Sequence, residues 1–210
     1  MFQDRLDAGK LLAAKLSKYK GKKNVVVLGI PRGGVEVAYA IANELRVEIG
    51  AAVAKKIPFP GNPELAVGAV AFGGMVSLND SFAFQHGVGK DYIDGEVNRI
   101  AAEIERRYAA FRAEVPSVKG KVAIIADDGM ATGHTVLAAV RAVRKGKPKR
   151  IIVAVPVSSR QAAGLVRAEA DELLCLDIPD FFRAVGEFYR HFPQLTDEDV
   201  IGYLKKSKAA

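Results

Sequence analysis

The chain has 210 residues, of which 50% are hydrophobic and 26% are charged, and its formal net charge is +7. These values are ordinary for a soluble globular protein, and at this length roughly 70% of the unfolded surface can be buried in one main core. Because no apolar run approaches the ~20 residues of a membrane-spanning helix and no signal-peptide core is visible, we expect a cytoplasmic protein without a membrane partner.

The cysteine content and the charge clusters narrow the function classes further. The single cysteine, Cys175, excludes an intramolecular disulfide and cysteine metal clusters, and its apolar surroundings predict a buried thiol. Basic residues gather at 18–23, 141–150 and 205–208. Such clusters can contact nucleic acid or attract a polyanionic small substrate. Nucleic acid is not expected as the main partner, because no aromatic-rich strand or helix-turn-helix pattern accompanies the charge.

The first quarter of the chain predicts a strand–helix–strand unit behind an amphipathic helix. Apolar residues from Phe2 to Leu16 alternate with charged residues, which favours that first helix. A short β-branched run at 24–30 predicts a buried strand, and a helix over 35–45 and a strand over 47–54 follow. This order implies a right-handed crossover and parallel pairing of the two strands.

Prolines and glycines become frequent between residues 57 and 90. Two weak strands, at 66–71 and 76–78, with Gly73 and Gly74 between them, predict a hairpin. We expect this hairpin to be exposed, and its glycine content suits a mobile lid over a neighbouring site.

The second half returns to alternating strands and helices. Residues 93–111 predict a long amphipathic helix that packs on a sheet face. The elements after it are expected at 122–126, 150–155 and 172–176 for strands, and at 136–145 and 160–170 for helices. Five main strands with intervening helices predict an α/β fold with a doubly wound, mainly parallel five-stranded sheet.

The tail after Asp177 does not continue the alternation. It concentrates aromatic residues between 181 and 192, and residues 196–204 predict a capped terminal helix. We therefore expect a core over 20–176, with the lid near 57–90, and a small hood subdomain built from 1–19 and 177–210.

The strand at 122–126 ends in two adjacent acids, Asp127 and Asp128. Polar groups that follow a parallel strand lie at the carboxyl edge of the sheet, where ligands of open α/β folds bind. Ionised carboxylates only accept hydrogen bonds, so this pair suits vicinal hydroxyls or a divalent cation.

A turn of small residues and threonines follows the acids and opens the next helix. Its members are Ala131, Thr132, Gly133, His134 and Thr135. Free backbone N–H groups, hydroxyls and the positive end of the helix dipole converge there, which is the pattern of a phosphate site. An ordinary strand, turn and helix, with Asp128 as a cap, is the alternative, but it does not explain two acids and two threonines at this spacing.

A second glycine-rich turn, Arg32-Gly33-Gly34, ends the first strand. Glycines let backbone amides approach a phosphate closely, and Arg32 can offer a bidentate fork to its oxygens. A tight turn with a solvent-facing arginine is the alternative. The three histidines have no metal-ligand spacing, and the chain has no serine-hydrolase elbow, P-loop or dinucleotide fingerprint.

The stretch from Val122 to Val136 closely resembles the phosphoribosyl pyrophosphate (PRPP) motif of type I phosphoribosyltransferases. The match covers four apolar residues, two acids, two variable positions and a small-Thr-Gly-x-Thr loop. Pro-Arg-Gly-Gly-Val at 31–35 and Ala-Val-Gly-Glu-Phe-Tyr at 184–189 resemble one predicted branch of that family. Gly129 departs from the pattern, since the family usually has an aliphatic residue there.

The resemblance implies transfer of a 5-phosphoribosyl group from Mg-PRPP to a nitrogen of an acceptor, with a nucleobase expected, and release of pyrophosphate. It implies a 5-phosphate loop at 131–135, where we expect His134 to contribute its backbone amide, with a ring that faces the ligand as the alternative. Asp127 and Asp128 would grip the ribose and position Mg2+, directly or through the substrate. Arg32, Gly33, Gly34 and Lys56 would bind pyrophosphate, and the hood would contact the acceptor.

Two other functions stay open. The same fold can serve as a non-catalytic PRPP- or nucleotide-sensing regulator that contacts nucleic acid or protein, because fold does not settle function. A phosphatase that uses the paired acids would release phosphate instead of pyrophosphate. The sequence identifies neither the acceptor nor the oligomeric state, so a homo-oligomer is left open.

Overall fold

The computed structural model of the chain describes residues 1–111 and 117–206. Its elements follow in the order α1 (Arg5–Lys15), η1 (Ser17–Tyr19), β1 (Val25–Gly29), α2 (Gly33–Leu45), β2 (Glu48–Ala51), β3 (Ala54–Phe59), β4 (Asn62–Ala71), η2 (Phe72–Gly74), β5 (Met75–Leu78), α3 (Asp80–Gln85), α4 (Lys90–Phe111), β6 (Val122–Ala126), α5 (His134–Lys145), β7 (Arg150–Val157), α6 (Arg160–Arg167), β8 (Glu172–Asp177), η3 (Val185–Phe188) and α7 (Asp197–Lys206).

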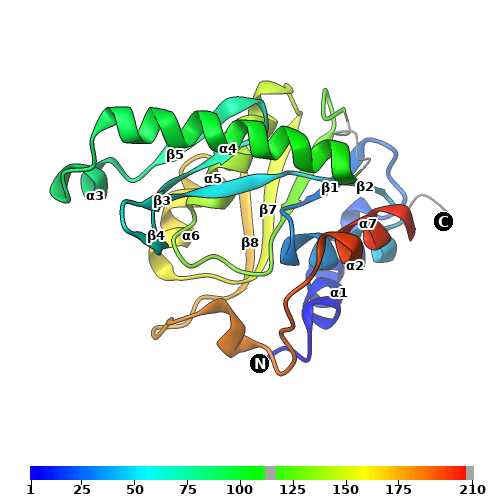
Figure 1. Ribbon diagram of the computed structural model, residues 1–210. Helices are drawn as coiled ribbons and strands as arrows, with labels where there is room; N and C mark the ends of the chain where they lie inside the picture. The colour runs from blue at the N-terminus through cyan, green and yellow to red at the C-terminus, as the bar shows by residue number, and fades with distance from the viewer. Residues whose placement is uncertain (112–116, 207–210) are drawn as a thin grey trace.

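The expected five-stranded parallel sheet is confirmed, in the order β2-β1-β6-β7-β8. Strands β1 and β6 are buried along their whole length, as expected for central strands covered on both faces. Val25 and Val27 contribute to the core under α1 and α2, whereas Val26 and Leu28 contribute to the core under α5 and α6. This alternation, with helices on both faces, is the doubly wound arrangement (Figure 1).

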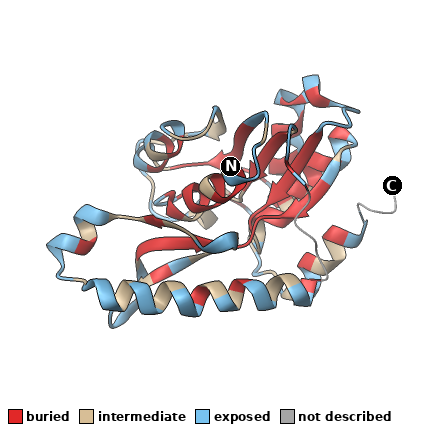
Figure 2. Ribbon diagram, turned by 90° about the horizontal axis from the view of Figure 1, so that it is seen from above, coloured by how far each residue is buried: buried red, intermediate tan, exposed pale blue. Residues whose placement is uncertain are grey.

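The segment expected to be an exposed hairpin is a three-stranded antiparallel sheet, in the order β3-β4-β5. Strand β3 was not predicted, and the expected strand over 47–54 ends earlier, because Ala54 already belongs to β3. The expectation of exposure was wrong for β4, where Val67, Ala69 and Val70 are fully buried. The small sheet packs between α5 and the long helix α4, which leaves one side of α4 exposed (Figure 2). Lid motion of this segment stays a prediction.

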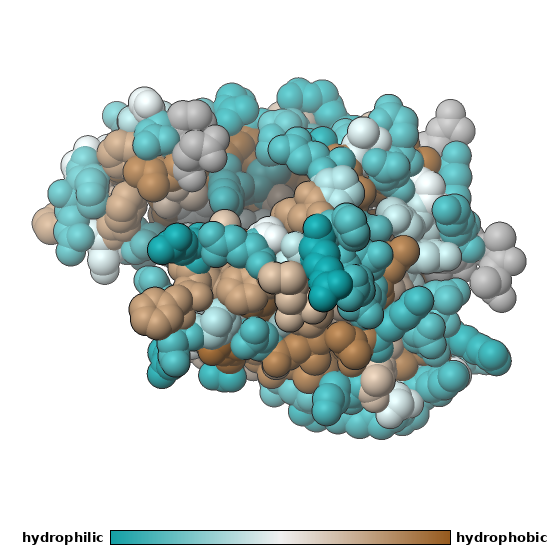
Figure 3. Space-filling view, turned by 90° about the horizontal axis from the view of Figure 1, so that it is seen from below, coloured by the Kyte–Doolittle hydropathy of each residue, from teal (hydrophilic) through white to brown (hydrophobic). Residues whose placement is uncertain are grey.

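An aromatic cluster connects the two ends of the chain. Phe2 and Tyr189 pack with the partly buried Phe182, Phe188 and Phe192. The aromatic part of the tail lies beside the N-terminus in Figure 1, and Figure 3 shows apolar atoms gathered on that underside of the molecule. Helix α7, expected in the hood, packs mainly against α2 instead.

Two smaller expectations were also tested by the fold. Cys175 is half-buried rather than fully buried, and burial raises its thiol pKa to about 11. Within the described ranges, no helix combines the length and the apolar character that crossing a membrane requires.

Candidate active site

The two acids and the small-residue turn line one cavity at the carboxyl edge of the parallel sheet. Asp127 and Asp128 directly follow β6, the middle strand of five. The cavity has a volume of about 220 Å³ and is lined by Lys56, Asp127, Asp128, Gly129, Met130, Ala131, Thr132, Gly133, Thr135, Val136 and Val185. The geometry therefore brings the acids, the turn and Lys56 to one cavity.

The turn before α5 is held in place by hydrogen bonds to the neighbouring strand and to Ser159. Met130 N donates to Val157 O at 3.0 Å, and Ser159 Oγ donates to Ala131 O at 2.6 Å. Gly133 has φ of 79°, a left-handed conformation that glycine adopts without strain. Because the first N–H groups of a helix have no partner within it, the amides that begin α5 are available to an anion.

The threonines add donors to this turn. Thr132 is exposed and Thr135 is half-buried, and both line the cavity. In the described part of the chain, neither hydroxyl has a hydrogen-bond partner, so both are free to bind a phosphate oxygen.

Close packing requires glycine at both positions that begin α2. A Cβ on Gly34 would lie 2.7 Å from the carbonyl oxygen of Ala126, and one on Gly33 would lie 1.9 Å from Asp128 Oδ2. Only glycine lets the amino end of α2 approach the acids this closely. The glycine pair thus lies where the resemblance implies a pyrophosphate loop.

Burial dominates the electrostatics of the two acids. Burial raises the pKa of Asp127 well above its ordinary value, and the neighbouring charge of Asp128 raises it further. Burial also raises the pKa of Asp128, and the neighbouring guanidinium of Arg5 partly offsets this rise. Two carboxylates held in this way gain stability when a cationic group binds between them.

Two predicted residues, and the neighbour of a third, occupy less direct positions. Arg32 is exposed and does not line the cavity, although it immediately precedes α2. The ring of His134 points to β5, where its Nδ1 lies 3.2 Å from the hydroxyl of Ser77, so only the backbone of His134 belongs to the turn. Lys55, the neighbour of Lys56, forms an ion pair with Glu103 on α4.

Residues 2–192 match the family of the phosphoribosyl transferase domain. The chain belongs to this family. "Putative phosphoribosyl transferase Rv0571c" of Mycobacterium tuberculosis H37Rv is 37% identical over 210 residues, which are 99% of this chain and 47% of that protein. The chain therefore spans about half the length of the curated relatives it matches.

Solved structures support the same fold. The crystal structure of TT1426 from Thermus thermophilus is 38% identical, with a TM-score of 0.81 and coverage of 98% of both chains. A purine phosphoribosyltransferase from Pyrococcus horikoshii is 17% identical, with a TM-score of 0.50 and coverage of 91% and 93%. The latter likeness concerns the fold alone.

The sequence reasoning missed three side chains of this phosphoribosyl transferase domain. Arg5 forms an ion pair with Asp128 at 2.8 Å, and Tyr189 donates to the carbonyl oxygen of Asp128 at 2.6 Å. Val185 takes up the space over Gly129, where a Cβ would lie 2.6 Å from Val185 Cγ1. The hood thus contributes the aliphatic group that the turn itself lacks.

The donor set fits a magnesium ion only when the substrate supplies further ligands. Among the described residues, no group of three or more histidine, cysteine or acidic side chains converges on one point. Asp127 and Asp128 alone offer carboxylates at this cavity. Mg2+ usually keeps waters and binds through one or two carboxylates together with substrate phosphates, which these two acids match.

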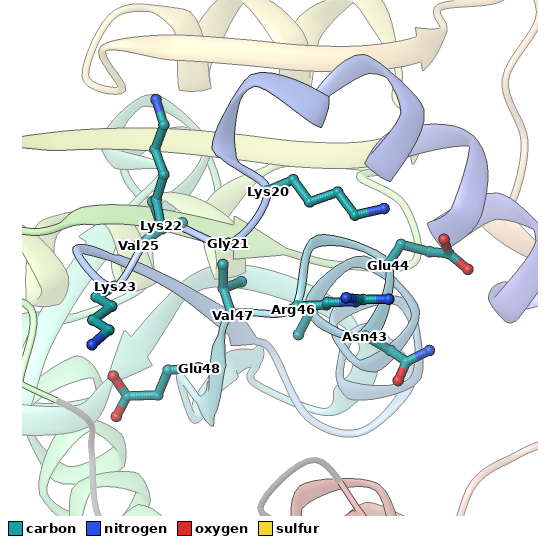
Figure 4. Close-up of a pocket in the computed structure, with 11 residues that line it drawn as sticks. Lys20, Gly21, Lys22, Lys23, Val25, Asn43, Glu44, Arg46, Val47 and Glu48 are labelled. Carbon is teal, nitrogen blue, oxygen red and sulfur yellow. The ribbon is translucent and has the colours of Figure 1, made fainter. Parts of the chain in front are cut away.

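A larger cavity of the domain, of about 770 Å³, lies at the opposite edge of the sheet. Figure 4 shows Lys20, Lys22, Lys23 and Arg46 around it, together with Glu44 and Glu48. These side chains come from the segment before β1 and from the end of α2 to the start of β2, so this cavity is separate from the Asp127–Asp128 site.

Proposed function

We propose that the domain transfers the 5-phosphoribosyl group of PRPP to a nitrogen atom of an acceptor, with a nucleobase as the expected class. The bond from C1 of the ribose to the pyrophosphate oxygen breaks, and its electron pair leaves with pyrophosphate. The nitrogen lone pair forms the new C1–N bond, and the proton of that nitrogen passes to solvent. The shared cavity of two strand-end acids and a threonine-lined amide turn carries this proposal.

The turn would hold the 5-phosphate end of the substrate. The amides of residues 131–135 and the hydroxyls of Thr132 and Thr135 supply donors, and the amino end of α5 adds a positive potential. No cationic side chain is required within the turn itself, since backbone amides at a helix start are sufficient for anion binding.

The acids would act on the ribose. Positive charge develops at C1 as pyrophosphate departs, and Asp127 and Asp128 lie at the edge where that charge would form. Their half-buried carboxylates are positioned before the reaction, so they stabilise the charge without reorganisation.

The leaving group would lie between the two glycine-rich elements. The amides of Gly33 and Gly34, the exposed Arg32 and the cavity-lining Lys56 would neutralise pyrophosphate. Magnesium, when bound through the substrate and the two acids, would supply further neutralisation of the pyrophosphate oxygens.

The direct test incubates the protein with PRPP, Mg2+ and a panel of purines, pyrimidines and orotate, and measures pyrophosphate and nucleotide. Release of both with at least one acceptor is expected. Asp128→Asn should lower turnover at least tenfold, which corresponds to ~1.4 kcal/mol. Asp180→Asn, at an acid whose side chain is 80% exposed, is the matched control and should leave turnover unchanged.

A specific observation favours the regulator as a second candidate. Backbone hydrogen bonds join the loops at the amino edge, from Lys149 N to Lys121 O at 2.8 Å and from Gly120 N to Lys147 O at 3.0 Å. The segments that precede the five strands, at 20–24, 44–48, 117–121, 145–150 and 168–172, carry ten cations, at 20, 22, 23, 46, 119, 121, 145, 147, 149 and 150, against five acids, at 44, 48, 169, 171 and 172. This positive surplus is a feature that nucleic-acid phosphates could neutralise.

Binding experiments separate the two candidates. A regulator would bind PRPP without turnover on any acceptor and would bind RNA or DNA with an affinity that falls steeply as salt rises. An enzyme would release pyrophosphate, whatever its affinity for nucleic acid. Release of inorganic phosphate alone would instead indicate a phosphatase.

A further inference from the structure

Arg5, the first residue of α1, is a buried arginine that the proposed reaction does not yet use. Its side chain is 5% exposed. Its Nε donates to Asp128 Oδ2 at 2.8 Å, and its Nη1 donates to the carbonyl oxygen of Pro193 at 2.8 Å. A charge withdrawn from water is costly unless it is paired and hydrogen-bonded, so these partners keep the guanidinium in one place.

Two further groups enclose the same guanidinium. Its Cζ lies 3.8 Å from the centre of the Phe192 ring, and Glu36 Oε2 lies 3.8 Å from Nη1. Glu36 is held in turn by Tyr203 of α7, whose hydroxyl donates to Glu36 Oε1 at 2.8 Å. The Arg5 side chain is therefore the point where helices α1 and α2, the Asp127–Asp128 edge and the tail meet.

The tail segment 188–193, here called the strap, is attached to the N-terminal residues by backbone hydrogen bonds. Phe2 N donates to Phe188 O at 2.7 Å, and His191 N donates to Gln3 O at 3.0 Å. Tyr189, within the strap, also contacts Asp128. Figure 1 shows the hood and the N-terminus side by side at the same end of the molecule.

Asp128 is consequently restrained on one side and open on the other. Its Oδ2 is occupied by Arg5 and lies against Gly33, where there is no room for a Cβ. The residue still lines the cavity, so Oδ1 is the oxygen left for a ribose hydroxyl. The direction in which this carboxylate points depends on Arg5.

We propose that Arg5 is a positioning residue that orients the Asp128 carboxylate toward the ribose and ties the strap over the carboxyl edge of the sheet. The catalytic half of this inference rests on the proposed phosphoribosyl transfer. The strap half rests only on the hydrogen bonds of Arg5 and is tested without any ligand.

Kinetics of Arg5→Met and Arg5→Lys test the catalytic half. Arg5→Met should lower kcat about 10- to 100-fold, because a misplaced group loses its alignment with the reacting centre, and should change KM for PRPP less than about threefold. Arg5→Lys keeps the charge and should recover part of the loss. Arg160→Met removes an exposed arginine of the Arg160–Asp180 pair and should match the wild type.

A double-mutant cycle separates positioning from general stabilisation. If Arg5 acts through Asp128, Arg5→Met should cost less than about twofold in kcat when introduced into Asp128→Asn. The assay is run well below the melting temperature of every variant. A full, additive loss in the double variant, or no loss in the single variant, would overturn the positioning role.

Hydrogen exchange tests the strap half in the protein alone. Arg5→Met should speed amide exchange over 188–192 about tenfold, while Arg160→Met should not. Unchanged exchange in Arg5→Met would show that Arg5 does not tie the strap. If Arg5→Met does not fold, the exchange of the strap is measured in Arg5→Lys, which keeps a cation at this position. If the wild-type protein releases no pyrophosphate with any acceptor, the proposed function is refuted. The exchange result still tests whether Arg5 ties the strap.

Discussion

The acidic side chains at the two edges of the parallel sheet differ in how the fold treats their charge. At the carboxyl edge, burial raises the pKa of Asp127, Asp128 and Glu36. At the amino edge, hydrogen bonds from arginines lower the pKa of Glu169 and Asp171. The same residue type is therefore destabilised when ionised at one edge and stabilised at the other.

This difference indicates where a ligand would change the energy of the protein. A cation or a cationic transition state at the carboxyl edge would relieve carboxylates that lack sufficient neutralisation. The amino-edge acids already have partners, such as Arg141 for Glu169 at 2.6 Å, and gain less from a new one. Perturbed groups in a cavity are typical of functional sites, which supports the assignment of the site to the carboxyl edge.

The largest expected effect comes from filling the contact between α2 and the acids. Gly34→Ala places a Cβ 2.7 Å from a backbone oxygen that cannot move aside, so the free energy of unfolding should fall by about 2–3 kcal/mol. Urea unfolding measures this loss. Gly164→Ala, on α6 with open space around the new Cβ, is the control and should gain about 0.5–1 kcal/mol. Equal stability of the Gly34 variant and the wild type would contradict the close approach.

A smaller effect is expected where the hood meets the turn. Gly129→Ala should lower the free energy of unfolding by about 1 kcal/mol, because its Cβ would lie 2.6 Å from Val185 Cγ1. Val185→Ala should relieve the clash, so the two substitutions together should cost less than their sum. Thermal unfolding of the four proteins measures this coupling. Strict additivity would show that Val185 does not occupy the space over Gly129.

Replacing one acid at each edge should give opposite pH dependences. Burial raises the pKa of Glu36, so its ionised form weakens the fold as pH rises above the unfolded pKa, and the weakening is complete above the folded pKa. Glu36→Gln should therefore be more stable than the wild type at neutral pH, by less than about 1 kcal/mol, and the gain should vanish in acid.

Glu169→Gln is the matched variant at the amino edge. In the wild type, hydrogen bonds from Arg141 are the main cause that lowers the pKa of Glu169 in the folded state. The ionised form of Glu169 therefore stabilises the fold above the unfolded pKa. The variant should lose up to about 0.5 kcal/mol at neutral pH, because the pair is partly exposed, and the loss should vanish as pH falls through the folded pKa. Unfolding curves between acid and neutral pH compare the two, and the same sign in both would remove the contrast between the edges.

The smallest effect is expected from the exposed lysines of the amino edge. Replacement of Lys22 and Lys23 by glutamine should change the free energy of unfolding by no more than about 0.5 kcal/mol, since both side chains are exposed. Turnover with PRPP should also stay unchanged. A tenfold loss of turnover would show that the two edges are coupled.

The parts of this site that lie close together in the sequence could be predicted from it. The apolar run of β6, the acids that follow and the small residues before α5 are consecutive, and each has a local preference that agrees with the structure. The five parallel strands could be predicted for the same reason, because their β-branched runs alternate with helical patterns.

The remaining parts arise from contacts between distant segments. Strand β3 was missed because Lys55, Lys56 and Pro58 hide its alternation, and its stability comes from pairing with β4. Arg5 reaches Asp128 across 123 residues, and no local pattern indicates that pairing. One signal was present, however, because Arg5 falls on the same helical stripe as the buried Ala8 and Leu12, where a charge needs a partner.

The hydrogen bond from Arg5 to Pro193 joins positions 188 residues apart. A ribosome makes the first helix before the proline, so the growing chain must add 188 residues after the arginine before this acceptor exists. The pocket can reach its finished form only after nearly the whole domain has been released. A truncated translation product that stops before the proline would keep most of the parallel sheet yet leave its carboxyl edge without this contact.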